Sequence, residues 1–379
     1  MKKFIVLCTV LCCLVSLAFA GGAKATDTVS IGAVFPLSGQ VAFYGTESRD
    51  GALLAIEEIN ASGGLLGKKL ALISEDDEGN AEKSVNAFTK LNTRDKVSFV
   101  LGSSTSGATQ AMTALAQQAK VILISPSATN TAVTRTGDYI FRACFIDPFQ
   151  GVVGADFAYD TLGSRNAAIL YDAGADYNTG LADSFRRQFQ ARGGRIAADE
   201  AYQTGDVDFN AQVTRIKAAN PDVVYLPNYY NDVTLQAKQL RQQGIICALV
   251  GGDGWDGLID NAGDEVLNGF WSAGFAADTT DPRGRTFVTA YTSRFNKTAS
   301  QFAALGYDTM MLVADGIKAA GTFDPAAVKT AMAKINGPYV TGNIRFDENR
   351  DPIKGAAILE IVNKDGKLVN AYKTTVNPK

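Results

Sequence analysis

The sequence predicts an α/β protein of two similar lobes, each built on a doubly wound parallel sheet. Short apolar runs alternate with helical stripes along most of the chain, which is typical of βαβ units. The alternation begins again after Pro148, so the pattern occurs twice. No linker rich in proline, serine and glycine separates the halves, and the length suits about two domains.

Each half follows the same order of predicted elements, with right-handed crossovers expected between its parallel strands. Strands are expected at residues 29–35, 70–74, 97–101 and 121–124, and helices at 49–60, around 85–91 and at 107–120. In the second half strands are expected at 167–171, 195–202, 222–226 and 246–251, and helices at 181–192, around 209–216 and at 233–243. Residues 139–145 are expected to form a strand that crosses directly between the halves.

The N-terminus has the pattern of a secretory signal peptide. Lys2 and Lys3 precede an apolar stretch at residues 4–20, and small residues follow it. Cleavage is expected after Ala25, with Ala20 as the alternative, which gives residues 1–25 as signal peptide. Cys144 and Cys247 are then the remaining cysteines; we expect two free thiols, with a disulfide as the alternative in an exported chain.

Composition argues against several classes of function. The chain contains no histidine, which removes the Ser-His-Asp triad and the commonest zinc ligand. A net charge of −3 with interspersed signs does not suit a nucleic-acid partner. The acidic run at residues 75–78 lacks the spacing of a calcium-binding loop. We therefore expect neither a catalyst nor a metal or cofactor site.

The loops that follow the predicted strands divide into two chemical kinds. In doubly wound sheets these loops hold the ligand. In the first half, residues 102–107 and 125–130 offer hydroxyls and glycines beside helix N-termini, which favour an anion. In the second half, the loops at residues 176–177, 228–230 and 252–256 offer tyrosines and a carboxylate, which suit a cation. A free α-amino acid carries both charges and would lie between the halves.

Three stretches in the first half carry a family resemblance. They are Ile-Gly-Ala at 31–33 with Pro-Leu-Ser-Gly at 36–39, Ile-Asn-Ala-Ser-Gly-Gly-Leu-Leu-Gly at 59–67, and Ile-Ser-Pro-Ser-Ala-Thr-Asn at 124–130. With them the chain resembles the type I periplasmic binding proteins, specifically the leucine/isoleucine/valine-binding group, over essentially the whole mature length. The resemblance implies a monomeric, periplasmic solute-binding protein that delivers its ligand to the membrane permease subunits of an ABC importer.

The resemblance also implies a hinge and a binding site. Residues 26–146 and 276–350 would form lobe I, residues 147–275 and 351–379 lobe II, and three strands would cross near 143–147, 272–275 and 350–351. Ser106, with Ser104 or Thr105 if the register shifts, would bind the ligand carboxylate together with Ser127 and Thr129. Asp253, where the family often has Glu, would bind the ammonium group. The remaining candidates are aromatic: Tyr44, Phe149, Tyr177, Tyr229 and Tyr307.

Simpler interpretations of these residues stay open. The serines and Thr129 could be helix N-caps, the tyrosines ordinary half-buried aromatics, and Asp253 a turn residue. The favoured ligand is an apolar branched-chain or aromatic L-amino acid. The alternatives are a binding protein for an aromatic or other small carboxylate or amide, and a soluble ligand-sensing co-receptor.

Overall fold

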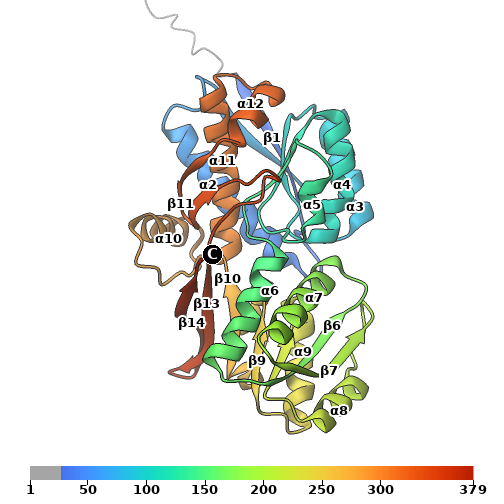
Figure 1. Ribbon diagram of the computed structural model, residues 1–379. Coiled ribbons are helices and arrows are strands. Elements are labelled where there is room, and N and C mark those ends of the chain that lie inside the picture. Colours follow the sequence, from blue (N-terminus) through green and yellow to red (C-terminus); the bar gives the residue numbers. More distant parts are fainter. Residues whose placement is uncertain (1–26, 379) are drawn as a thin grey trace, which may run out of the picture.

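The computed structural model describes residues 27–378 and consists of two α/β lobes that meet at a waist (Figure 1). The predicted signal peptide lies outside the described residues. Lobe I contains a five-stranded parallel sheet in the order β2-β1-β3-β4-β5. Lobe II contains a seven-stranded sheet in the order β14-β13-β10-β9-β8-β6-β7, in which β13 and β14 are antiparallel. The predicted fold class, two doubly wound parallel-sheet lobes, is confirmed.

The chain enters lobe I, crosses to lobe II, returns to lobe I and ends in lobe II. The first passage through lobe I comprises β1 Thr28–Phe35, α2 Ala42–Ala61, β2 Lys69–Asp76, α3 Ala81–Thr93, β3 Phe99–Gly102, α4 Ser106–Ala119, β4 Ile122–Ser125, α5 Ala132–Arg135 and β5 Ile140–Arg142. Lobe II comprises α6 Asp147–Asp156, η1 Phe157–Thr161, β6 Asn166–Asp172, α7 Asp176–Ala191, β7 Arg195–Tyr202, α8 Asn210–Ala219, β8 Val223–Leu226, α9 Tyr230–Gln242, β9 Ala248–Gly251, the short η2 Asp253–Trp255, η3 Leu258–Asp260 and η4 Asp264–Val266, and β10 Gly269–Ala273. The return adds α10 Pro282–Phe295, α11 Gln301–Ala320, α12 Pro325–Met332, β11 Asn336–Tyr339 and β12 Gly342–Arg345 to lobe I, and β13 Ala356–Lys364 and β14 Lys367–Val376 to lobe II.

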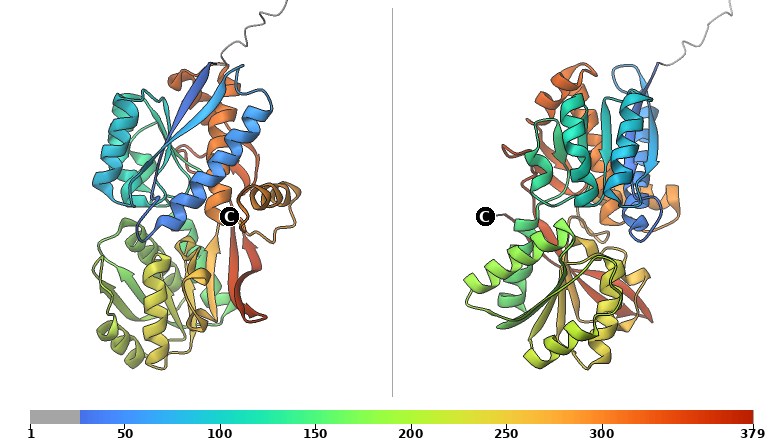
Figure 2. Two further views of the ribbon diagram at one scale, coloured as in Figure 1. Left: turned by 180° about the vertical axis from the view of Figure 1, so that it is seen from behind. Right: turned by 90° about the vertical axis from the view of Figure 1, so that its right-hand side faces the viewer.

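Helices cover both faces of each parallel sheet (Figure 2). As a result the central strands are buried along their whole length, as β4 and β8 illustrate. This explains why their sequences, Ile-Leu-Ile-Ser and Val-Val-Tyr-Leu, are continuous apolar runs rather than alternating ones. The carboxyl ends of the parallel strands of both lobes face the region where the lobes meet, so several of the loops described above line one cavity there.

Two helices begin earlier than the sequence predicts, and both early turns contribute to the waist. Helix α2 begins at Ala42 rather than at residue 49, and α7 begins at Asp176 rather than at residue 181. The first turn of α2 carries Tyr44, which contacts Tyr229 and Tyr230 of lobe II. The first turn of α7 carries Tyr177, which packs in the lobe II core and lines the cavity between the lobes. The predicted strand at 139–145 is also shorter, because only Ile140–Arg142 pairs with β4 and the rest continues as the crossing to α6.

A buried ion pair joins two of the crossing segments. The Nε atom of Arg142 lies 2.7 Å from Oδ1 of Asp351, and the two side chains are 0% and 2% exposed. Arg142 also donates to the carbonyl oxygens of Ala128 and Asn130, at 2.5 Å and 2.8 Å. Thr134 donates to the same Asp351 oxygen at 2.8 Å. These contacts fix the segment that leaves β12 against the end of β5.

Both cysteines are free, as expected: Cys144 is buried, whereas Cys247 is partly exposed. Burial raises the pKa of the Cys144 thiol to about 12. Because the thiolate is the reactive form, a thiol reagent should modify Cys247 in the folded protein and spare Cys144. Mass spectrometry after labelling, with and without denaturant, measures this. Equal labelling of both thiols under native conditions would contradict the buried position of Cys144.

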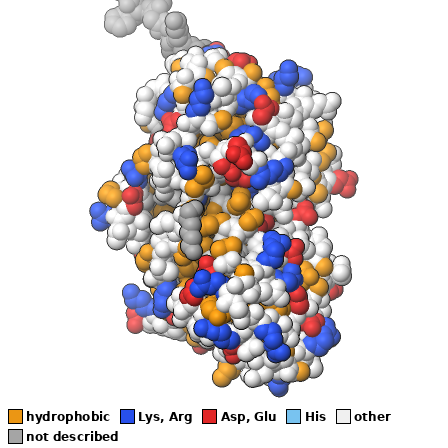
Figure 3. All heavy atoms as spheres, viewed as in Figure 1, with side chains coloured by type: hydrophobic (Ala, Val, Ile, Leu, Met, Phe, Trp, Pro, Cys, Tyr) orange, Lys and Arg blue, Asp and Glu red, His pale blue; other side chains and the backbone are white. Residues whose placement is uncertain are grey.

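The surface carries charges of both signs. Lys and Arg side chains lie among Asp and Glu side chains over the face in Figure 3, without a large area of one sign. Within residues 27–378, no helix combines the length and apolar character needed to cross a membrane.

Candidate ligand-binding site

A small, almost completely filled cavity lies between the lobes. It is lined by residues at the carboxyl ends of strands in both lobes and at the start of α11: Tyr44, Ser104, Ser106, Ser127, Tyr177, Tyr229, Asp253, Gly254 and Phe302. Seven of the residues predicted from the sequence are among them. Within the described chain, no group of three or more His, Cys, Asp or Glu side chains is arranged to hold a metal ion.

The lobe I wall presents hydroxyls and a helix N-terminus. Ser106 is the first residue of α4, and its hydroxyl oxygen accepts from the backbone N–H of Asn130 at 3.2 Å. The N-cap, Thr105, makes no side-chain capping hydrogen bond. The hydroxyl of Ser127 donates to the carbonyl oxygen of Ser104 at 2.8 Å, which ties the two loops together. The positive end of the helix dipole therefore faces the cavity and favours an anionic group.

The lobe II wall presents a single carboxylate, that of Asp253, which is 3% exposed. Its Oδ1 atom accepts from the hydroxyl of Tyr177 at 2.9 Å and from Nε2 of Gln150 at 3.1 Å. Gln150 in turn accepts from the Asp253 N–H at 3.2 Å and from the Ser272 hydroxyl at 3.0 Å. Both side-chain donors reach Oδ1, so the other carboxylate oxygen remains for a donor from a ligand.

The electrostatics of Asp253 point to a cationic partner. Burial raises its pKa to about 6, and the hydrogen bonds from Gln150 and Tyr177 counteract part of that rise. The carboxyl group is thus mainly ionised at neutral pH. No ion pair within residues 27–378 includes Asp253. A buried carboxylate without a counter-charge is unfavourable, and a ligand cation would supply one.

Aromatic rings form the remaining walls. Tyr177 stacks on Tyr229 with ring centroids 4.9 Å apart, and Tyr44 stacks on Phe302 at 4.3 Å. The two stacked pairs also contact each other. The rings of Tyr44 and Tyr229 pack edge to face, with centroids 5.7 Å apart and planes inclined by 62°. The hydroxyls of Tyr44 and Tyr177 already bond to protein atoms, so these two residues offer the cavity mainly apolar ring surface.

Two of the predicted residues lie beside the cavity without lining it. Thr129 is fully buried at the crossing, where its carbonyl oxygen accepts from the Asp147 N–H at 3.0 Å. Phe149 is half-buried on α6 and packs edge-on against Phe145 at 6.0 Å. Both residues therefore contact the segment that crosses between the lobes rather than the cavity itself.

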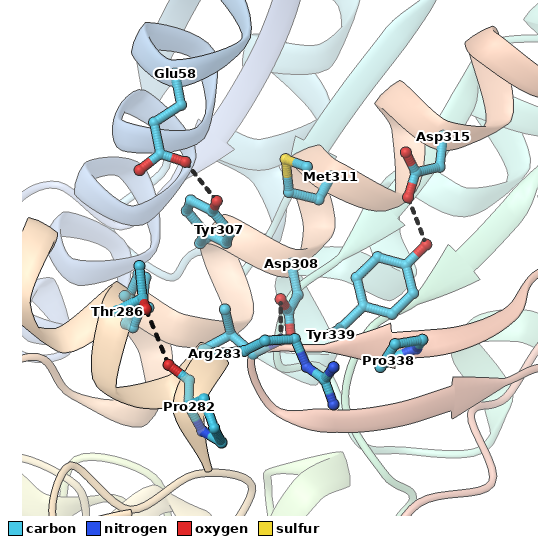
Figure 4. A pocket seen from close by; sticks show the side chains of 12 residues that line it. Glu58, Pro282, Arg283, Thr286, Tyr307, Asp308, Met311, Asp315, Pro338 and Tyr339 are labelled. Atoms are coloured by element: carbon cyan, nitrogen blue, oxygen red, sulfur yellow. Dashed lines mark hydrogen bonds between the residues drawn. The ribbon is translucent and has the colours of Figure 1, made fainter.

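Tyr307 lies in a different cavity, within lobe I (Figure 4). Its hydroxyl donates to Glu58 on α2 at 2.6 Å. It shares α11 with Phe302, but five residues at about 100° each turn it to another side of the helix. Phe302, which the sequence analysis did not single out, is the residue of α11 that reaches the interlobe cavity.

Comparison with known proteins agrees with this architecture. The periplasmic binding protein family matches residues 28–367. The leucine-, isoleucine-, valine-, threonine- and alanine-binding protein of Pseudomonas aeruginosa is 31% identical over 339 residues, which cover 88% of this chain and 89% of that protein.

Two solved structures show the same fold. A branched-chain amino acid transporter substrate-binding protein from Streptococcus pneumoniae, in complex with isoleucine, has a TM-score of 0.85 and 35% identity, with 93% of this chain and all of that one covered. A solute-binding protein of an ABC transporter from Rhodopseudomonas palustris, in complex with 3,4-dihydroxybenzoic acid, has a TM-score of 0.85 and 26% identity, with 93% and 98% covered.

The chain is a solute-binding protein rather than an enzyme, because it belongs to the periplasmic binding protein family. The predicted family is confirmed.

Proposed function

We propose that this protein binds a free, apolar L-amino acid between its lobes and delivers it to the membrane permease subunits of an ABC importer. The main support for the proposal is that one small cavity has two chemically different walls, one from each lobe. The N-terminus of α4 in lobe I suits a carboxylate, and the buried Asp253 of lobe II suits an ammonium group. An α-amino acid presents both groups on one carbon atom.

The aromatic walls support an apolar side chain. Stacked rings leave the hydroxyls of Tyr44 and Tyr177 bonded to the protein, so a polar side chain would find few partners there. Leucine, isoleucine, valine and phenylalanine are the candidates. Relatives whose names state binding of branched-chain amino acids, at about 30% identity or more, favour the first three.

A second candidate is an aromatic carboxylate without an ammonium group. It is favoured by the tyrosine-rich lining and by the relative that holds 3,4-dihydroxybenzoic acid. Such a ligand would leave the buried charge of Asp253 unpaired, and for this reason we prefer the amino acid.

A thermal-shift screen tests the proposal. The mature protein is unfolded and refolded to remove any carried ligand, then melted with each of the twenty amino acids and with a panel of simple carboxylic acids. A ligand at about 100 times its dissociation constant stabilises the fold by about 2.7 kcal/mol. We expect upward shifts with apolar L-amino acids only. Shifts confined to carboxylates that lack an amine would support the second candidate instead.

Ligand binding should weaken in acid. The ammonium group of the ligand binds the ionised form of Asp253, whose pKa in the closed site is raised to about 6. A proton therefore competes with the ligand as the pH falls through 6, whereas affinity stays nearly constant between pH 7 and 8. Calorimetric titration of L-leucine across pH 5 to 8 measures the effect. An affinity that increases towards pH 5 would contradict the role of Asp253.

A further inference from the structure

The hydroxyl of Tyr44 bridges the two lobes. Tyr44 belongs to lobe I, and its Oη atom donates to the carbonyl oxygen of Gly254 in lobe II at 2.5 Å. The same atom accepts from the backbone N–H of Tyr230, also in lobe II, at 3.3 Å. Both hydrogen bonds are buried. They can form only when the lobes are closed, because donor and acceptor belong to different lobes.

The residue that Tyr44 contacts is the one next to the ammonium-binding carboxylate. The Gly254 N–H donates to the hydroxyl of Tyr177 at 2.9 Å, and that hydroxyl donates to Asp253. Two phenols, one from each lobe, therefore hold the same residue at its N–H and at its carbonyl oxygen. A Cβ atom at this position would lie 2.9 Å from the Tyr177 hydroxyl, so glycine permits the close approach.

The Tyr44 ring is held in place by lobe I. It stacks on Phe302 of α11 with centroids 4.3 Å apart, and the side chain is only 1% exposed. Burial raises the pKa of the phenol well above its usual value, so the hydroxyl keeps its proton and remains a donor. Tyr229 and Tyr230 of lobe II also pack on the ring, with centroids at 5.7 Å and 5.3 Å. Lobe I thus supplies the donor and lobe II the acceptor.

We propose that Tyr44 is an interlobe latch: its hydroxyl stabilises the closed form without help from a ligand and fixes the Asp253–Gly254 segment in its binding position. The Tyr44 hydroxyl has a positioning role, since it acts on the ligand through Asp253, whereas the ring lines the cavity. Its effect on the ligand rests on the proposed function, whereas its effect on lobe closure does not.

Two other buried hydrogen bonds join the lobes at the start of α11, where Gln301 donates from Nε2 to the carbonyl oxygen of Asp253 at 2.8 Å and from its backbone N–H to Asp256 at 2.9 Å. Further hydrogen bonds between the lobes are less protected from water. The Tyr230 hydroxyl donates to the carbonyl oxygen of Gln40 at 2.7 Å in a partly buried position. Asn130 donates to the carbonyl oxygen of Asp176 at 2.8 Å in an exposed one. Water can replace such partners when they are lost. It cannot readily reach the Gly254 carbonyl in the closed form, so loss of the Tyr44 hydroxyl should disfavour that form specifically.

The test uses Tyr44→Phe, which keeps the stacked ring and removes the hydroxyl. Its matched control is Tyr202→Phe, which removes a buried hydroxyl that bonds only within lobe II, to Asp232. Spin labels at Lys83→Cys in lobe I and Asp183→Cys in lobe II, with Cys247→Ser, report the distance between the lobes in the ligand-free protein. Net loss of one hydrogen bond should reduce the ratio of closed to open protein about fivefold to tenfold in Tyr44→Phe and leave it unchanged in the control. Equal distance distributions for the unsubstituted and Tyr44→Phe proteins would overturn the latch.

Binding kinetics with L-leucine as the probe give a second readout. Tyr44→Phe should raise the dissociation rate constant about tenfold with little change in association, because a closed-state contact has been lost. An unchanged dissociation rate would overturn the positioning role. Failure of the unsubstituted protein to bind L-leucine or another amino acid would instead reject the proposed function, and the ligand-free distances would still decide on the latch.

Discussion

Replacing Asp253 by asparagine should raise the dissociation constant for L-leucine by several hundred-fold or more. Removing one partner of a buried charge pair costs about 3–5 kcal/mol, because the other charge stays buried and unpaired. Asparagine has nearly the shape of aspartate but cannot neutralise an ammonium group. The fold should tolerate the change, since Asp253 has no cationic protein partner within the described chain.

Calorimetry on the purified variant measures this loss. Asp232→Asn is the control, since Asp232 is also a lobe II carboxylate in a partly buried place, where it accepts from the Tyr202 hydroxyl at 2.7 Å outside the ligand cavity. We expect near-normal affinity for the control. Comparable affinities for Asp253→Asn and the unsubstituted protein would show that the ammonium group binds elsewhere.

Replacing Asp351 by asparagine should lower the free energy of unfolding by about 3 kcal/mol, since it leaves the buried Arg142 charge without its partner. Urea unfolding of the ligand-free variant measures the change. Glu57→Gln is the control: it breaks a bidentate ion pair with Arg294 whose side chains are 43% and 50% exposed, and such pairs contribute at most about 1 kcal/mol. Equal losses for the two variants would mean that burial of the hinge pair has no special effect.

The fold could be predicted from sequence because its signals are local and repeated. Apolar runs such as Ile122–Ser125 identify strands buried on both faces, and apolar positions three or four residues apart identify the helices between them. Most of the interlobe cavity could also be predicted, because residues that follow parallel strands gather at one edge of a sheet. Ser106, Ser127 and Asp253 are of this kind.

The remainder depends on how helices and lobes are oriented in space. Tyr307 and Phe302 share one helix, and only the packing of α11 against α2 and lobe II decides which of them faces the cavity. Gln150 gave no local signal either, since its contact with Asp253 joins residues 103 positions apart. The aromatic residue in the first turn of α11, the second helix after the chain returns to lobe I, is the sequence signal that could have identified Phe302. The antiparallel pair β13 and β14 was likewise not predicted.

Closure of the lobes brings the two halves of the proposed binding site together. Lobe I contributes the helix N-terminus and the stacked pair of Tyr44 and Phe302, and lobe II contributes Asp253 with the two side chains that orient it. A ligand that binds both half-sites favours the closed arrangement by its differential affinity for that state. In the proposed function, an ammonium group would offset the buried charge of Asp253 in the closed form, which would link ligand charge to conformation.

The central claim is that the protein recognises the carboxylate and the ammonium group of one amino acid together. Calorimetric comparison of L-leucine with 4-methylpentanoate, which is L-leucine without its amino group, tests this most directly. The account predicts tight binding of L-leucine and a loss of at least about a hundredfold for 4-methylpentanoate, equal to about 3 kcal/mol. Equal or tighter binding of 4-methylpentanoate would contradict it and would assign the cavity to simple carboxylates.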